Sequence, residues 1–137
     1  MSDMFSVFGV SGSALDVYKT WINAVSDNVA NADNTSSTSG PAFQARYIVA
    51  QGVPGGPDGT GAGVKVAGVE YGPANGIEVY DPNNPLADNQ GMVRKPDMDM
   101  GEQMTSLIIA QRGYEANLAV VSRAQSAYQA ALSIGNA

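Results

Sequence analysis

The segment MTSLIIAQRGYEANLAVVSRAQSAYQAAL, residues 104–132, decides the fold of this chain. Its mostly apolar seam residues recur at alternating spacings of three and four, which is the period of one face of an α-helix. The positions are Met104, Leu107, Gln111, Tyr114, Leu118, Val121, Gln125, Tyr128 and Leu132. Asp99 with Glu102 resembles a capping box, and Gly135 with Asn136 suits a helix end. The spacing therefore predicts a long C-terminal helix with a coiled-coil seam.

The amino-terminal part of the chain shows the same alternation. Its seam positions are Phe8, Ser11, Leu15, Tyr18, Ile22, Val25, Val29 and Ala32. All seven prolines lie between Pro41 and Pro96, so both ends of the chain lack the strongest helix breaker. We expect an α+β protein in which two long terminal helices, within residues 1–35 and 99–137, pair as an antiparallel coiled coil.

The predicted C-terminal helix is too long for its own chain to surround. Residues 102–134 would span roughly 50 Å at about 1.5 Å per residue. They hold only four charged side chains, whereas a solvated helix face carries more. We therefore expect this helix to contact other chains. The alternative is a single face packed on its own domain, because the many alanines are also simply strong helix formers.

Residues 36–98 are predicted to form a small β-hairpin-rich outer module inserted between the helices. Phe43, Ala45, Tyr47 and Val49 alternate with polar residues, and the parity of the next strand shifts across Ala67-Gly68, as a β-bulge would cause. Asn75-Gly76 predicts a hairpin that joins this strand to residues 77–80. Residues 51–63 hold six glycines and two prolines, which predicts a mobile connecting loop.

The amino-acid composition excludes several kinds of partner, metal site and catalytic site. Seven basic against 13 acidic residues give a net charge of −6, which disfavours nucleic acid and anionic membrane surfaces as partners. The chain has no Cys and no His, so disulfides, thiolate or imidazole metal sites and Ser-His-Asp arrangements are excluded. No stretch is long enough to span a membrane, and no cleavable signal is predicted. We expect a soluble protein without catalysis, cofactor or direct membrane insertion.

Three weaker patterns leave alternatives open. Gly59-x-Gly61-x-Gly63 lacks the strand-loop-helix context of a phosphate-binding loop. The aspartates of residues 81–99 could supply paired carboxylates, but nothing in the sequence brings two of them together. Oxygen ligands for Ca²⁺ could come from Asp81, Asn83, Asn84, Asp88 and Asn89, although Pro85 breaks the EF-hand pattern. The alternative function is therefore a calcium- or carbohydrate-binding extracellular module with a helical clamp.

Three sequence elements resemble those of the flagellar basal-body rod family. Residues 28–35, NVANADNT, resemble the N-x-A-N-x-x-T end of the first helix in flagellar axial proteins, with one extra residue before Thr35. Residues 79–88, VYDPNNPLAD, and residues 110–117, AQRGYEAN, are similar to the proximal rod subunits of that family. Pro96-Asp97 stands where the family usually shows Pro-Asn.

The resemblance implies a structural subunit of the flagellar rod that transmits torque. Such subunits are exported by the flagellar type III apparatus and assemble with other rod proteins and with copies of themselves. In the family the terminal helices form an inner tube and the β module faces outward. The expected assembly interface comprises Leu15, Tyr18, Ile22, Val25, Asn28, Val29, Asn31, Met104, Leu107, Tyr114, Asn117, Leu118, Val121, Tyr128 and Leu132.

Three asparagines of this interface, Asn28, Asn31 and Asn117, have a more specific expected role. A paired amide beside a helix seam fixes the register of the helices at some cost in stability. The alternative for these residues is solvent exposure, combined with capping of the helix end by Asn31 or Asn34.

Overall fold

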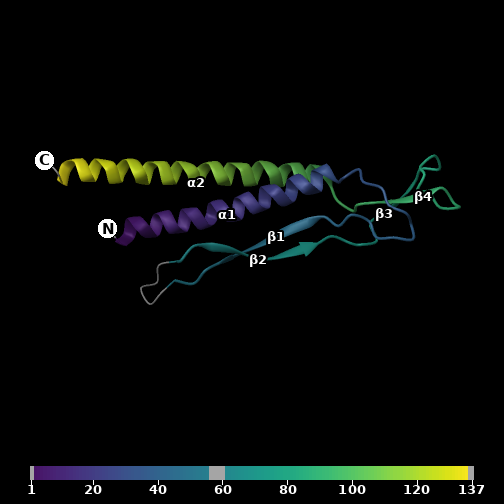
Figure 1. The fold of residues 1–137 in the computed structure, drawn as a ribbon, viewed down its shortest axis with the longest axis horizontal. Helices are drawn as coiled ribbons and strands as arrows, with labels where there is room; N and C mark the ends of the chain where they lie inside the picture. Colours follow the sequence, from purple (N-terminus) through teal and green to yellow (C-terminus); the bar gives the residue numbers. More distant parts are fainter. Residues whose placement is uncertain (1, 56–60, 136–137) are drawn as a thin grey trace.

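The computed structural model describes residues 2–55 and 61–135 and has α+β architecture, as the sequence predicts. The elements are α1 (Ser2–Ala30), β1 (Arg46–Gly52), β2 (Val64–Tyr71), β3 (Ile77–Tyr80), β4 (Met92–Lys95) and α2 (Met100–Gly135). The molecule is elongated, with α2, α1 and the β1–β2 hairpin lying in successive layers (Figure 1). Strands β3 and β4 lie at the end remote from both termini (Figure 1).

The two helices lie side by side and run in opposite directions (Figure 1). Asn28 of α1 hydrogen-bonds Gln103 of α2, and the ring of Tyr18 lies against Gly113. Moving ten residues back along α1 thus corresponds to moving ten residues forward along α2, as antiparallel packing requires. In this register residues 130–135 of α2 extend beyond Ser2 of α1.

The helix ends follow local sequence signals. Asp99 caps α2, because its Oδ1 accepts a hydrogen bond of 2.8 Å from the Glu102 N–H. This part of the predicted capping box is confirmed. Helix α1 begins earlier than the expected Phe8 and runs through Gly9 and Gly12, each at a cost of about 1 kcal/mol relative to alanine. Helix α2 includes Gly135, and the expected end at Asn136 lies outside the described residues.

Two antiparallel two-stranded sheets form the β part of the molecule, β1–β2 and β3–β4. In the first sheet Val49 pairs with Gly68 and Ala50 pairs with Val66. Ala67 is therefore the extra residue of a β-bulge, and the predicted bulge is confirmed. The first strand begins at Arg46 rather than at Phe43.

The hairpin predicted at Asn75-Gly76 is wrong. Strand β2 pairs with β1 and strand β3 with β4, so the strands on either side of this dipeptide belong to different sheets. A type I′ hairpin turn needs positive φ at both central residues. Among the described residues only glycines have positive φ, and Gly76 has a φ of 54°. Its N–H closes a turn on the carbonyl of Pro73 at 3.2 Å, which carries the chain from one sheet to the other.

Both ends of the segment predicted as a mobile loop, residues 51–63, belong to the β1–β2 hairpin. Strand β1 continues through Gly52, and the Val53 N–H donates to the Gly63 carbonyl at 2.8 Å. The loop end of the hairpin is held on α1, because the Val64 N–H donates to Ser13 Oγ at 3.0 Å. These hydrogen bonds offset the entropy that composition alone predicts to be prohibitive. Residues 56–60 of the predicted loop, including Gly59 of the Gly59-x-Gly61-x-Gly63 pattern, lie outside the described residues.

The apolar core is thin. Its buried apolar residues are all alanine or valine: Val17, Ala24, Val25, Ala42, Ala45, Val93 and Ala110. Two of the three largest fully buried side chains are amides, those of Asn28 and Gln103. Neither described helix has the length and apolar character needed to cross a bilayer.

Candidate assembly surface

A buried amide cluster joins α1, α2 and β1. Asn28 is 0% exposed and Gln103 is 1% exposed. The Asn28 Nδ2 group donates to Gln103 Oε1 and to the Arg46 carbonyl, each at 2.9 Å, and Asn28 Oδ1 accepts from the Arg46 N–H at 2.8 Å. The side chain of Arg46 forms an ion pair with Asp27, on the turn of α1 beside the cluster. One asparagine therefore satisfies both backbone groups of Arg46 and also binds the second helix.

Gln103 was missed by the sequence reasoning, because a polar residue next to the predicted seam does not register as an interface position. A signal was present in the heptad spacing of Gln103, Ala110, Asn117 and Ala124. In the structure Gln103 and Ala110 are buried, and Asn117 and Ala124 are half-buried. These residues mark the face of α2 that contacts α1.

The structure places the predicted seam of α2 in two different environments. Leu107, Tyr114 and Val121 are half-buried beside α1. The remaining predicted apolar residues of α2 are exposed, with Met104 at 46%, Leu118 at 44%, Leu132 at 49% and Tyr128 at 36%. The contact within the chain is thus rotated toward the small residues of α2, and part of the predicted seam is left uncovered.

The predicted residues of α1 lie closer to the middle of the molecule. Val25 and Asn28 are buried, and five others are half-buried: Leu15, Tyr18, Ile22, Val29 and Asn31. The ring of Tyr18 stacks on Trp21 with a centroid separation of 6.2 Å. Helix α1 is covered by α2 on one side and by the β1–β2 hairpin on the other (Figure 1).

Asn31 and Asn117 bond to their own helices. Asn31 Nδ2 donates to the Asp27 carbonyl at 2.8 Å, near the end of α1. Asn117 Nδ2 donates to the Gly113 carbonyl at 2.8 Å. Of the three predicted asparagines, Asn28 is the one whose amide bonds across elements in the described part of the chain.

Helix α2 exposes large apolar side chains along most of its length, from Met100 to Ile134. At about 100° per residue, Met104, Ile108 and Leu118 fall within about 80° of one another on one flank. Ile109 and Val120 fall together on the opposite flank. We call these five side chains, together with Leu132 and Ile134 beyond the end of α1, the exposed apolar residues of α2. Their arrangement leaves two flanks of one helix available to neighbouring chains.

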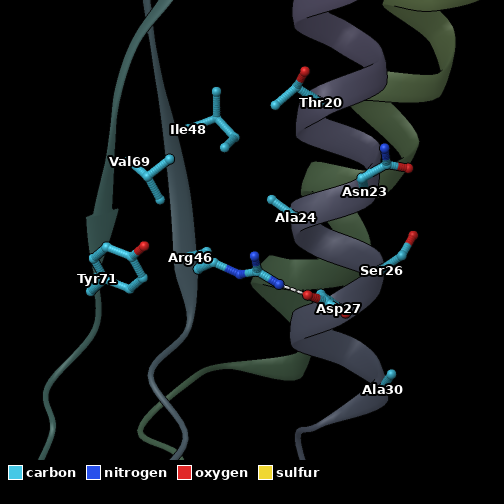
Figure 2. A pocket seen from close by; sticks show the side chains of 10 residues that line it. All are labelled: Thr20, Asn23, Ala24, Ser26, Asp27, Ala30, Arg46, Ile48, Val69 and Tyr71. Carbon is cyan, nitrogen blue, oxygen red and sulfur yellow. Dashed lines mark ion pairs between the residues drawn. The ribbon is translucent and has the colours of Figure 1, made fainter.

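A groove of about 640 Å³ lies between α1 and the β1–β2 hairpin. Figure 2 shows Ala24 of α1 facing Ile48 and Val69 across it, and the Asp27–Arg46 ion pair bridging α1 and β1 below them. Asp27 is the only carboxylate in the lining, and Arg46 neutralises it. The groove therefore offers contact surface rather than the two facing carboxylates that acid and base catalysis would use.

The aspartates considered as calcium ligands hold the loop between β3 and β4 in shape. Backbone N–H groups of Met92 and Gln90 donate to Asp88 Oδ1 at 3.0 and 2.8 Å, and the Thr38 hydroxyl donates to Oδ2 at 2.9 Å. These donors lower the pKa of Asp88, the Met92 N–H most strongly. Asp81 Oδ2 accepts from Asn84 at 3.1 Å. Within the described residues, no three acidic side chains converge as metal ligands would.

Comparison with known proteins defines the class. Residues 89–134, which cover β4 and nearly all of α2, match the family model described as "Flagellar basal body rod FlgEFG protein C-terminal". This match covers about a third of the chain, and together with the relatives described next, which span nearly all of it, it shows a flagellar basal-body rod protein.

Three relatives narrow this class. The flagellar basal-body rod proteins FlgC of Escherichia coli O157:H7 and of Salmonella typhimurium are each 35% identical to this chain over 132 residues, covering 96% of the chain and 98% of the relative. FlgC of Borreliella burgdorferi is 34% identical over 148 residues, covering 96% and 97%. The chain therefore belongs to the FlgC family of flagellar basal-body rod proteins, as a structural subunit of the rod located in the basal body. Neither the family match nor the relatives support the calcium- or carbohydrate-binding alternative.

Proposed function

We propose that the terminal helices assemble this subunit with copies of itself and with other rod proteins into the shaft that transmits torque. The exposed apolar residues of α2 carry this proposal. A soluble chain that acted alone would leave this long, weakly charged apolar helix surface in water. In a helical assembly, neighbouring helices would cover both flanks and the segment that extends beyond Ser2.

The energetic gain from such coverage is substantial. Complete burial of one Leu, Ile or Met side chain contributes roughly 1.5 to 3 kcal/mol. The exposed apolar residues of α2 are about half-exposed, so each would gain on the order of 1 kcal/mol. Seven such residues in every subunit would together gain on the order of 7 kcal/mol, which is comparable to the ~4 to 15 kcal/mol that association costs, and the partner surface buried at the same contacts adds to this gain.

The proposed interface comprises the residues that the family resemblance implies, and it has two parts. Met104, Leu118, Tyr128 and Leu132 are exposed and would contact neighbouring subunits directly. The half-buried residues beside α1, such as Tyr18 and Tyr114, would maintain the helix pair, for which we propose the geometry of an antiparallel coiled coil. Residues 36–98 would then form the β-rich outer module between helical segments 1–35 and 99–137.

The proposal also covers the export of the subunit, its lack of catalysis and cofactor, and its charge. We infer export by the flagellar type III apparatus, as the resemblance to the flagellar rod family implies. The subunit would act without catalysis or a cofactor, through rigid contacts alone. Its net charge of −6 agrees with a partner surface made of protein helices rather than nucleic acid.

The substitution Leu118→Asp tests the proposed interface. Leu118 is 44% exposed, so the full chain should fold, while a carboxylate on this flank should prevent a neighbouring helix from packing. Ala119→Asp is the matched control, because it adds the same charge at an exposed position four residues before Arg123. We expect cells with Leu118→Asp to stop rod assembly at this subunit and to lose motility, whereas cells with Ala119→Asp swim. Normal swimming with Leu118→Asp would contradict the proposal.

A further inference from the structure

The amide cluster at Asn28 is the one place in the described structure where both helices and a strand meet through fully buried polar side chains. Asn28 uses both Nδ2 hydrogens and its Oδ1 there, on Gln103 and on the backbone of Arg46. The surrounding apolar residues are mostly alanine and valine, which pack similarly in several registers. Apart from the contact of Tyr18 with Gly113, apolar burial therefore discriminates weakly between one alignment of the helices and the next.

A buried amide pair has the opposite property. It contributes little net stability over apolar packing, but it strongly disfavours any alignment in which it is broken. Sliding α1 by one turn, 5.4 Å, along α2 would bring Asn28 opposite Leu107 or Asp99 instead of Gln103. A buried donor without its acceptor would disfavour the slip to Leu107 by about ten- to a hundredfold, and the slip to Asp99 would place the Asn28 amide beyond Met100, outside α2.

We propose that the Asn28–Gln103 pair is a register lock that specifies the position of α1 along α2. Because Asn28 also holds both backbone groups of Arg46, the lock sets the position of the β1–β2 hairpin relative to the same helix pair. This proposal goes beyond the role of the chain in the rod and concerns its own fold. It can be tested on the full chain without rods, so its failure would leave the assembly proposal standing.

The absence of native cysteines makes disulfide cross-linking a direct measure of register. In the observed alignment Val25 lies level with Ser106, three residues from the Asn28–Gln103 pair along each helix. Val25→Cys with Ser106→Cys therefore reports the native register. Val25→Cys with Glu102→Cys, or with Ala110→Cys, reports a slip of one turn in either direction.

Each cysteine pair is placed in three backgrounds. These are the parent chain, Gln103→Met, which keeps side-chain length but lacks the acceptor, and Gln103→Glu, which retains an oxygen at that position. The bonds between Asn28 and Arg46 remain possible in all three. The rate of disulfide formation in the dilute full chain is measured together with helicity by far-ultraviolet circular dichroism.

The lock predicts native cross-linking at least tenfold faster than either slipped cross-link in the parent and in Gln103→Glu. In Gln103→Met this preference should fall at least fivefold while helicity is retained. An unchanged preference in Gln103→Met would overturn the proposal and assign register to the Tyr18–Gly113 contact and apolar packing. Loss of helicity in Gln103→Met would also overturn it, because the pair would then stabilise rather than specify. Absence of the native cross-link in the parent would show that the chain alone does not hold this register, with the same consequence.

Discussion

Gly113 allows α2 to approach Tyr18, and its replacement by alanine provides a quantitative test of the helix packing. A Cβ atom at position 113 would overlap the Tyr18 ring, which is itself stacked on Trp21. Overpacking of this kind costs about 1 to 3 kcal/mol. Alanine also gains about 1 kcal/mol in helix propensity over glycine. Gly113→Ala should therefore destabilise the chain by about 1 kcal/mol.

A double-mutant cycle separates the two contributions. In a Tyr18→Leu background the overlap disappears, so Gly113→Ala should stabilise the chain by about 1 kcal/mol, a reversal of sign. Gly12→Ala is the matched control, because an added Cβ there meets nothing within 4 Å and should stabilise by about 1 kcal/mol in both backgrounds. Free energies of unfolding come from urea denaturation of the full chain. Stabilisation by Gly113→Ala in the presence of Tyr18 would refute the packing described here.

Three further predictions address the rest of the molecule. Gly76→Ala should destabilise by about 2 kcal/mol or more, because a Cβ there would overlap the Lys95 carbonyl at a φ of 54°, whereas Gly68→Ala, which meets no atom, should have a smaller effect in the same denaturation assay. Asn28→Ala should lower the free energy of unfolding by about 3 kcal/mol, because it leaves a cavity and unpaired backbone groups. A free energy of unfolding within about 0.5 kcal/mol of the parent, as for a surface substitution, would argue against the buried cluster. Because the pKa of Asp88 is lowered in the folded state, its carboxylate stabilises the fold above the ordinary aspartate pKa, and this contribution is lost as the pH falls through the lower folded-state pKa. Asp88→Asn should therefore weaken the acid sensitivity of the free energy of unfolding, and a pH profile identical to that of the parent would contradict this.

The helices could be predicted from sequence because their signals are local. Periodicity, the absence of proline and the Asp99 cap each act within a few residues, and all point to helix at both ends. The choice of face on α2 could not be predicted in the same way. A seam built from the largest apolar residues selects Met104 and Leu118, but close approach to α1 requires small residues such as Ala110 and Gly113, against which Tyr18 packs.

The β part shows the limit of local turn signals. Asn75-Gly76 is typical of a hairpin, yet β2 already has a partner in β1, and that pairing depends on residues far away in the sequence. The prediction of a mobile loop in the glycine-rich segment was incomplete for a similar reason, because composition indicates the entropy of the segment but not the hydrogen bonds of Val53 and Val64. The bulge at Ala67 could be predicted, because a shift of parity within one strand is itself local.

The amide cluster could be predicted only in part. The family resemblance pointed to Asn28, but its partner Gln103 lies 75 residues away and carries no apolar signal. Only the three-dimensional register brings the two amides and the backbone of Arg46 together. Polar residues inside a helix interface are therefore the ones that single-sequence periodicity is least able to find.

In the proposed rod, neighbouring subunits cover the exposed apolar residues of α2. Maleimide labelling of Ile108→Cys, as the only thiol in the chain, tests this claim most directly. Labelling is compared between the dilute full chain and purified basal bodies, normalised to denatured samples, with the exposed Asn89→Cys as the control. We expect the Ile108→Cys thiol to be labelled at least tenfold more slowly in basal bodies than in the dilute chain. Equal reactivity of that thiol in both samples would show that neighbouring subunits leave this position uncovered.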